Sequence, residues 1–397
     1  MGGRRLILLG TILAAGLLVV SCGGGDNNSS TDASLPTATA ELIRLVVPTR
    51  EPGQIWVDAL WFADETRGWA GGTYCGESSE RQDCIGLIFA TNDGGRTWTP
   101  QYRGNVAPMQ LQFVDSQRGM ALGYAAVDAE SGPAHVLVTQ DGGLHWKETY
   151  SLATDRAQLA LAAGDAWIVA SRCARQGLEP QDPCRIDLLR SSDDGDNWTE
   201  TELPIRGFNV RLSRPTPSDA WLVAMDADVA PVLMVTRDAG AAWTQLAAPW
   251  SGGPSELFFR DAEQGWALVG GGPAAGSQPK EIFATRDGGQ AWVHLAGSTS
   301  WRQAPPTSGS LTTGGYVGPM VFTSSTEGWM ALARLGLLHS SDGGVTWQSV
   351  YQEGDGLYAV QFVDPQHGWA HNKHTFIATD DGGSSWRVVP VPTVEGQ

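Results

Sequence analysis

Apolar and polar residues alternate in short runs that recur along the whole chain. Examples are Leu60-x-Phe62-x-Asp64, Leu111-x-Phe113-x-Asp115 and Val360-x-Phe362-x-Asp364. A period of two places every second side chain on the same side, which is typical of a β-strand buried on one face. We therefore expect each run to form a strand, which we call strand A.

A short apolar element, usually built around a tryptophan, follows each of these positions. It predicts a second strand, B, joined to strand A by a tight turn. Its seven copies are Gly68-Trp69-Ala70, Gly119-Met120-Ala121, Ala166-Trp167, Ala220-Trp221, Gly265-Trp266-Ala267, Gly328-Trp329-Met330 and Gly368-Trp369-Ala370.

A third element has the form Ser/Thr-x-Asp-x-Gly-x-x-Trp. An aspartate can accept hydrogen bonds from the backbone N–H groups of its own turn, and glycine supplies the positive φ that such turns need. The tryptophan can cover the turn and pack between neighbouring sheets. The seven copies contain Asp93, Asp141, Asp193, Asp238, Asp287, Asp342 and Asp381, and end at Trp98, Trp146, Trp198, Trp243, Trp292, Trp347 and Trp386.

The three elements together predict a repeating unit of four strands. Strand C precedes the aspartate turn, as Ile282–Thr285 does in the fifth copy, and strand D begins at the tryptophan of the motif. Successive copies of this tryptophan lie about 39 to 55 residues apart, which includes the length of one four-stranded propeller blade.

These motifs resemble the Asp-box, or bacterial neuraminidase, repeat. The order of the three elements most resembles the photosystem II stability/assembly factor family, over about residues 54–390. The resemblance implies an all-β fold, a seven-bladed β-propeller of four-stranded antiparallel blades with Asp-box turns, over residues 53–392. It does not define a function, because Asp boxes occur in sialidases, sorting receptors, glycanases and assembly factors alike.

Charge limits the partners that the chain can bind. It has 43 acidic residues against 26 lysines and arginines, for a net charge of −17. Phosphate binding requires clustered basic residues, so we expect no nucleic-acid partner. The photosystem assembly factors are thought to present an arginine-rich patch, and the acidic balance of this chain therefore argues against a photosystem client.

The N-terminal residues have the features of a bacterial lipoprotein signal. Arg4 and Arg5 precede an apolar stretch from Leu6 to Val20, which is too short for a membrane-spanning helix, and Val19-Val20-Ser21-Cys22 resembles a lipobox. The resemblance implies a signal peptide over residues 1–21 and a lipid on Cys22 that anchors the protein to a membrane. An ordinary secretory signal with a coincidental cysteine is the alternative.

The polar residues after Cys22 predict a flexible tether over residues 22–52. Whether residues 40–48 add a strand to the propeller is left open. Four further cysteines form two close pairs, and three connectivities are conceivable. Short loops in an oxidising compartment favour disulfides between Cys75 and Cys84 and between Cys173 and Cys184. Neither pair has the spacing of a zinc site.

Strand order predicts which end of the propeller binds a partner. The A–B turns and the Asp boxes share one end, while the B–C loops and the D–A crossovers share the other, and only the second set varies in length. Variable loops on a rigid scaffold are the usual binding surface, with neutral drift as the alternative. Candidate contacts in the crossovers are Trp250, Trp301, Arg302 and Tyr316, unless each indole packs on the rim of its own blade.

Motifs for catalysis and metal binding are weak. The Arg-Ile-Pro motif of sialidases does not precede the first box, and no motif pairs a tyrosine with a glutamate. A strand geometry would not bring His367, His371 and His374 together, and the box aspartates do not have the spacing of a calcium loop. We expect the acidic loop residues to be solvated rather than paired for glycoside hydrolysis: Glu77, Asp83, Asp128, Glu130, Glu179 and Asp182.

The sequence therefore favours an extracytoplasmic, lipid-anchored and monomeric propeller that acts as a non-catalytic protein-binding or assembly scaffold. No catalytic residue, metal or cofactor is predicted. The alternative is a sialidase-like or other glycoside hydrolase, or a carbohydrate-binding protein. Whether the partner on the variable loops is a protein or a glycan is left open.

Overall fold

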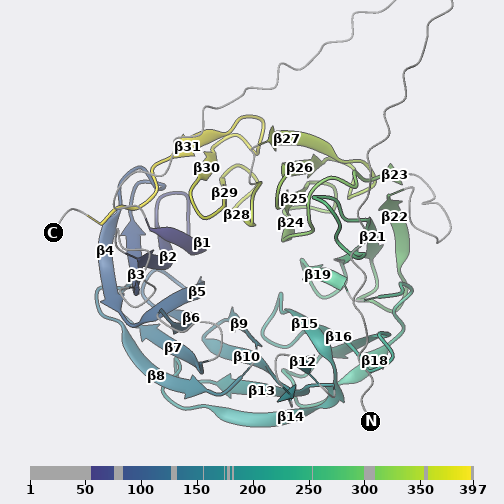
Figure 1. The fold of residues 1–397 in the computed structure, drawn as a ribbon, viewed down its shortest axis with the longest axis horizontal. Coiled ribbons are helices and arrows are strands. Elements are labelled where there is room, and N and C mark those ends of the chain that lie inside the picture. The colour runs from purple at the N-terminus through teal and green to yellow at the C-terminus, as the bar shows by residue number, and fades with distance from the viewer. Residues whose placement is uncertain are drawn as a thin grey trace, which may run out of the picture. The chain divides into compact units, whose positions relative to one another are not determined.

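The computed structural model describes residues 55–75, 84–126, 132–154, 156–173, 175–176, 179–180, 183–252, 254–298, 309–352 and 356–394. Within these ranges every regular element is a β-strand, and seven antiparallel sheets stand in a ring (Figure 1). This confirms the predicted all-β, seven-bladed propeller. The described residues contain no helix of the length and apolar character needed to cross a membrane.

The first four blades follow the order of the chain, with one insertion in blade 3. Their strands are β1 (Trp56–Phe62), β2 (Gly68–Cys75), β3 (Cys84–Thr91) and β4 (Thr99–Gly104); β5 (Val106–Phe113), β6 (Gly119–Ala125), β7 (Ala134–Thr139) and β8 (Lys147–Leu152); β9 (Arg156–Ala162), β10 (Asp165–Arg172), β13 (Arg185–Ser191) and β14 (Thr199–Arg206); β15 (Phe208–Ser213), β16 (Ala220–Met225), β17 (Pro231–Thr236) and β18 (Thr244–Leu246). A small hairpin of β11 (Arg175–Gln176) and β12 (Glu179–Pro180) lies between β10 and β13 in the sequence.

Blades 5 to 7 have the same order, and blade 5 carries an additional outer strand. Their strands are β19 (Pro254–Phe259), β20 (Gly265–Gly270), β21 (Lys280–Thr285), β22 (Val293–Gly297) and the parallel β23 (Gly309–Ser310); β24 (Met320–Phe322), β25 (Gly328–Leu332), β26 (Gly336–Ser340) and β27 (Gln348–Gln352); β28 (Ala359–Phe362), β29 (Gly368–His371), β30 (Phe376–Thr379) and β31 (Arg387–Val389). In every blade the first strand is nearest the centre of the ring and the fourth lies toward the rim (Figure 1).

The aspartate of each box motif is held inside its own turn. In blade 1, the Thr91 hydroxyl donates to Asp93 Oδ1 at 2.8 Å, the Thr97 amide donates to the same oxygen at 2.9 Å, and the Gly95 amide donates to Thr91 Oγ1 at 2.9 Å. The same three hydrogen bonds recur in the other six blades. The acceptor groups of these aspartates are thus used locally.

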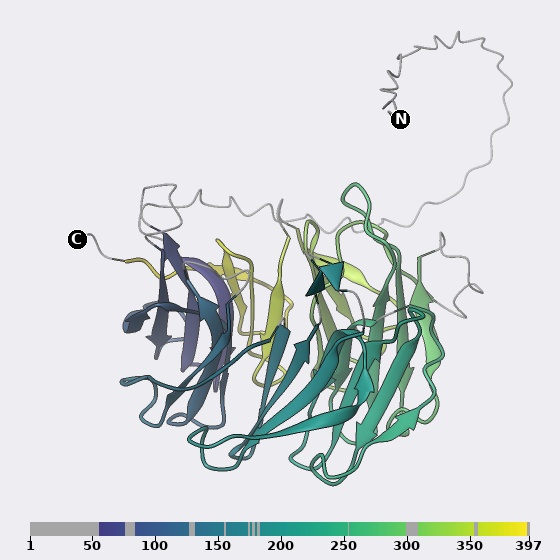
Figure 2. The same cartoon turned by 60° about the horizontal axis from the view of Figure 1, so that its bottom comes forward.

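The A–B turns and the box turns lie at the same end of the ring. In blade 1 the Gly94 amide donates to the Thr66 carbonyl at 2.8 Å, and equivalent bonds join the two turns in blades 2, 4, 5, 6 and 7. The B–C loops and the D–A crossovers lie at the opposite end, which we call the loop face; Figure 2 shows both ends from the side.

Tryptophans of strand B join a blade to the next at most junctions of the ring. The Trp69 ring stacks on Phe113 of blade 2 with 3.5 Å between centroids, and its Nε1 donates to the Gly142 carbonyl of the next box turn at 3.1 Å. Both contacts recur at three further junctions, for Trp221, Trp266 and Trp369. At the junction of blades 3 and 4, the guanidinium of Arg214 lies 4.0 Å from the Trp167 ring instead.

Glutamine side chains occupy the free inner edges of several strands. Gln112 donates to the Leu159 carbonyl and accepts from the Leu161 amide of the next blade, at 3.0 and 2.8 Å. Gln158 bonds both backbone groups of Leu212 in the same way. An inner strand has no sheet partner on the channel side, so these amides supply the partners that its backbone lacks.

Candidate functional site

The two predicted disulfides are formed at the loop face. Cys75 and Cys84 close the β2–β3 hairpin, with a sulfur–sulfur distance of 1.99 Å. Cys173 and Cys184 close the insertion between β10 and β13, at 2.00 Å. Each disulfide joins the end of strand B to the start of strand C, so it holds together the two strand ends between which the B–C loop runs. Disulfides persist in oxidising compartments and therefore suggest an extracytoplasmic location.

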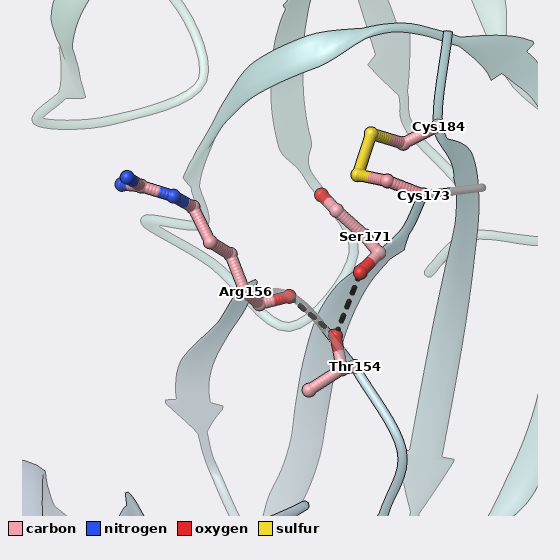
Figure 3. Close-up of a disulfide and its surroundings, with 5 residues drawn as sticks. All are labelled: Thr154, Arg156, Ser171, Cys173 and Cys184. Atoms are coloured by element: carbon pink, nitrogen blue, oxygen red, sulfur yellow. Dashed lines mark hydrogen bonds between the residues drawn. A yellow bond between two sulfur atoms is a disulfide. The ribbon is translucent and has the colours of Figure 1, made fainter. Parts of the chain in front are cut away.

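A threonine fixes the crossover beside the second disulfide. The Thr154 hydroxyl lies 2.7 Å from the Arg156 carbonyl and 2.9 Å from the Ser171 carbonyl, so it joins the crossover to β10 (Figure 3). The Arg156 side chain is exposed and extends away from the disulfide. The start of β9 thus presents a basic side chain at the loop face.

One of the predicted contact residues is in the core. Trp250 is only 4% exposed, and its ring lies 5.0 Å from that of Trp292 and 5.4 Å from that of Phe283. The crossover that carries it folds into the cluster between blades 4 and 5. Trp250 is therefore a core residue rather than one that a partner can reach, and its indole packs against blade 5 rather than on the rim of its own blade. Trp301 and Arg302 lie outside the described residues.

Tyr316 lies at the loop face, half-buried. Its hydroxyl oxygen accepts a hydrogen bond from the Gly276 amide at 3.0 Å, and the Arg334 guanidinium lies 5.4 Å from its ring centroid. Its backbone pairs with Ala333. Tyr316 is therefore held between the B–C loop of blade 5 and blade 6.

Three exposed apolar side chains lie directly before, or in the first half of, innermost strands, which is the half nearer the loop face, and the sequence did not single them out as contacts. Trp56 of blade 1 is 38% exposed, Met109 of blade 2 is 40% exposed and Tyr358 at the start of blade 7 is 42% exposed. These blades are neighbours in the ring. Met109 lies in a break of the β5–β6 register, and such bulges re-aim side chains. We call these three residues the entrance residues.

Two carboxylates on central strands, Asp58 and Glu256, are partly buried. The Lys373 ammonium lies 5.6 Å from the Trp56 ring. Burial raises the pKa of Asp58, although the positive charge of Lys373 opposes this shift. Burial also raises the pKa of Glu256 to about 7, against the effect of Arg211. Asp58 and Glu256 lie on blades 1 and 5, which are not neighbours in the ring.

The three histidines of blade 7 do not converge. The His367 Nδ1 lies 2.8 Å from Asp364 Oδ2 in the A–B turn, at the box end. His371 is buried, its Nδ1 lies 3.2 Å from the Asn372 carbonyl oxygen, and burial lowers its pKa to about 4. Within the described part of the chain, no three His, Cys, Asp or Glu residues are placed to hold a metal ion. The predicted loop carboxylates have side chains outside the described part.

A groove of about 640 Å³ lies beside strand β4, between blade 1 and the C-terminal segment. It is lined by Trp98, Tyr102 and Pro392 and by two arginines, Arg96 and Arg103. The Trp98 Nε1 donates to the Pro390 carbonyl at 2.9 Å. This groove follows the outer edge of blade 1 rather than the loop face.

Comparisons with known proteins show the fold. No protein-family model and no curated protein sequence matches the chain. Among solved structures, YCF48 bound to a D1 peptide is 19% identical, with a TM-score of 0.55, and the match covers 83% of this chain and 95% of that one. YCF48 from Cyanidioschyzon merolae is 17% identical, with a TM-score of 0.58 and coverages of 85% and 98%.

An enzyme shares the fold as well. The GH74 xyloglucanase from Xanthomonas campestris is 15% identical, with a TM-score of 0.52; the match covers 85% of this chain and 53% of the xyloglucanase. The chain thus spans about half the length of that enzyme. At these identities the comparisons establish a common propeller architecture, shared by a peptide-bound protein and a hydrolase.

Proposed function

We propose that this chain is an extracytoplasmic propeller, anchored by a lipid on Cys22, that binds a protein partner at its loop face without catalysing a reaction. The main support is the difference between the two ends of the ring. At the box end, polar groups bond within and between turns. Toward the loop face, the exposed apolar residues Trp56, Met109 and Tyr358 lie on three adjacent blades. The exposed apolar residues of the box end, Leu144 and Val293, lie on blades 2 and 5, which are not neighbours.

Exposed apolar and aromatic side chains on a rigid scaffold are characteristic of protein interfaces. Trp56 and Met109 lie on the innermost strands β1 and β5, and Tyr358 directly precedes the innermost strand β28, so a rigid blade positions two of the three side chains before a partner binds. Binding to such a surface costs little conformational entropy. YCF48, which has the same architecture, has been captured with a D1 peptide; this supports peptide binding as a use of the fold. Trp301 and Arg302 remain predicted contacts in the same proposal.

An affinity capture with matched variants tests the proposal. Full-length protein, solubilised from its host membrane in detergent, is used to capture partners, and the captured proteins are quantified by mass spectrometry. Tyr358→Ala and Met109→Ala should each reduce a specific partner at least about fivefold, because contacts at interface centres commonly contribute more than 1 kcal/mol. Leu144→Ala is the control, since Leu144 is 68% exposed on the box turn of blade 2.

Equal capture by the loop-face variants and the wild type would contradict the proposal. Turnover of sialosides or β-glucans by the purified protein would instead favour the hydrolase alternative. We expect hydrolysis of these substrates by the wild type to be no faster than in a buffer blank.

A further inference from the structure

Lys280, the first residue of strand β21, has no exposed surface. Lysine is almost never fully buried unless its charge is paired. No carboxylate among the described residues forms an ion pair with Lys280; its ammonium instead donates to five backbone carbonyl oxygens. These belong to Gln278, Gly314 and Gly315 at 2.9 Å, and to Thr312 and Thr313 at 3.3 Å.

The five carbonyls come from two separate segments of the loop face. One belongs to the B–C loop of blade 5, and four consecutive carbonyls belong to the crossover that enters blade 6. Gly315 has a φ of +71°, a conformation that glycine adopts at little cost, where the crossover bends around the ammonium. Consecutive carbonyls directed at one point are how backbones replace the hydration shell of a cation. Burial lowers the pKa of Lys280 to about 8, so the amine is mainly protonated at pH 7.

We propose that these carbonyls form a binding site for a primary ammonium group, which Lys280 fills and which fastens the crossover to the B–C loop. An ammonium has three N–H donors, so five acceptors share them. The Thr313 carbonyl also accepts from the Gln278 amide, but a side chain without donors would leave the other four without the ammonium donor that they share. Unpaired buried carbonyls are costly, and four adjacent ones also repel each other. The cation is therefore needed for the two segments to stay in contact.

Neutral hydrogen bonds also cross the same junction and report on it. The Gln278 amide donates to the Thr313 carbonyl at 2.8 Å, and the Gly315 amide donates to the Gly276 carbonyl at 3.0 Å. The Val317 amide donates to Gln278 Oε1 at 2.9 Å. These contacts set the position of Tyr316, whose hydroxyl bonds to the B–C loop. The inference does not depend on the partner proposed above.

Amide hydrogen exchange at pH 7 measures whether the ammonium holds this junction. In Lys280→Met, which keeps most of the apolar stem but has no donor, the amides of Gly315 and Val317 should exchange at least about tenfold faster than in the wild type, since hydrogen bonds to charged groups contribute about 1.5–3 kcal/mol. Lys147→Met is the control, because the Lys147 side chain is 76% exposed. Circular dichroism verifies that each variant keeps the propeller fold.

Chemical rescue then tests the ligand class. Lys280→Ala removes the equivalent of n-propylammonium, so adding n-propylammonium chloride should restore slow exchange of the Gly315 and Val317 amides. Propyltrimethylammonium chloride at the same concentration has the charge but no N–H, and should not restore it. Wild-type protection in Lys280→Met, no rescue by propylammonium, or equal rescue by both salts would overturn the proposal. If Lys280→Ala does not fold alone, recovery of the folded state in propylammonium is the readout.

Discussion

Trp369 of strand β29 stacks on Phe62 of strand β1, with 3.6 Å between ring centroids and 5° between ring planes. The two residues come from opposite ends of the propeller sequence. Trp369 Nε1 also donates to the Gly94 carbonyl of the first box turn, and Gln361 bonds both backbone groups of Phe62. The described strands of blade 7 all come from the C-terminal part of the chain. The ring is therefore closed between blades 7 and 1 by the same ring stacking and side-chain hydrogen bonds that join other neighbouring blades.

Trp369→Ala should destabilise the propeller by about 3–5 kcal/mol, as large-to-small changes of buried aromatic residues do. The indole is 1% exposed, so its removal leaves a cavity at the closing junction. Urea unfolding followed by tryptophan fluorescence measures this effect. Trp56→Ala is the matched control, because Trp56 is 38% exposed and its loss should change the free energy of unfolding far less.

Acid should weaken the box turns. Hydrogen bonds from the His145 backbone amide and side chain lower the pKa of Asp141 to about 2, and bonds from the Asn197 side chain and backbone lower that of Asp193 to about 2. A depressed carboxyl pKa stabilises the folded state above the unfolded pKa of about 4. This contribution should disappear as the pH falls from about 4 to about 2.

Urea unfolding at a series of pH values checks this dependence. The double variant Asp141→Asn and Asp193→Asn should show a shallower loss of stability over that interval than the wild type. Asp228→Asn, at an exposed position of the blade 4 loop, should follow the wild-type curve. Equal slopes for the wild type and the double variant would refute this role of the box aspartates.

Asp287→Ala separates stability from binding. Asp287 accepts from the Thr285 hydroxyl and the Ala291 amide at 2.8 and 2.9 Å, and removal of its carboxylate should cost about 1–3 kcal/mol. The residue lies at the box end, so affinity for a loop-face partner should be unchanged. The melting temperature and the Kd of the variant are both measured. Lost binding at an unchanged melting temperature would place the working surface at the box end.

Cys22→Ser tests the predicted anchor, which lies outside the described residues. The variant should remain as unprocessed precursor or be released into the medium, because a serine hydroxyl does not accept the diacylglycerol. Partitioning into a detergent phase measures the lipid, and Cys22→Ser should lose it. Partitioning equal to that of the wild type would contradict lipidation.

The sequence predicted features that depend on local patterns. The number of repeats predicted the number of blades, and the box motif predicted the turn that it forms. The short spacing between cysteines predicted the disulfide partners of Cys75 and Cys173. The sequence did not predict that Trp250 is a core residue, because its contacts, Trp292 and Phe283, come from the next blade and no local pattern encodes them. The Lys280 site was missed for a different reason: its ligands are backbone carbonyls, which any residue supplies.

Photo-crosslinking from two positions of the same blade tests the central claim most directly. A photoreactive amino acid replaces Met109 at the loop face or Leu144 at the box turn of blade 2, both of which are exposed apolar residues. Full-length protein is crosslinked in its host membrane, and the products are identified by mass spectrometry. The account predicts a discrete crosslinked protein partner from position 109 and none from position 144. A partner captured only from position 144, or the same partner in equal yield from both positions, would contradict binding at the loop face.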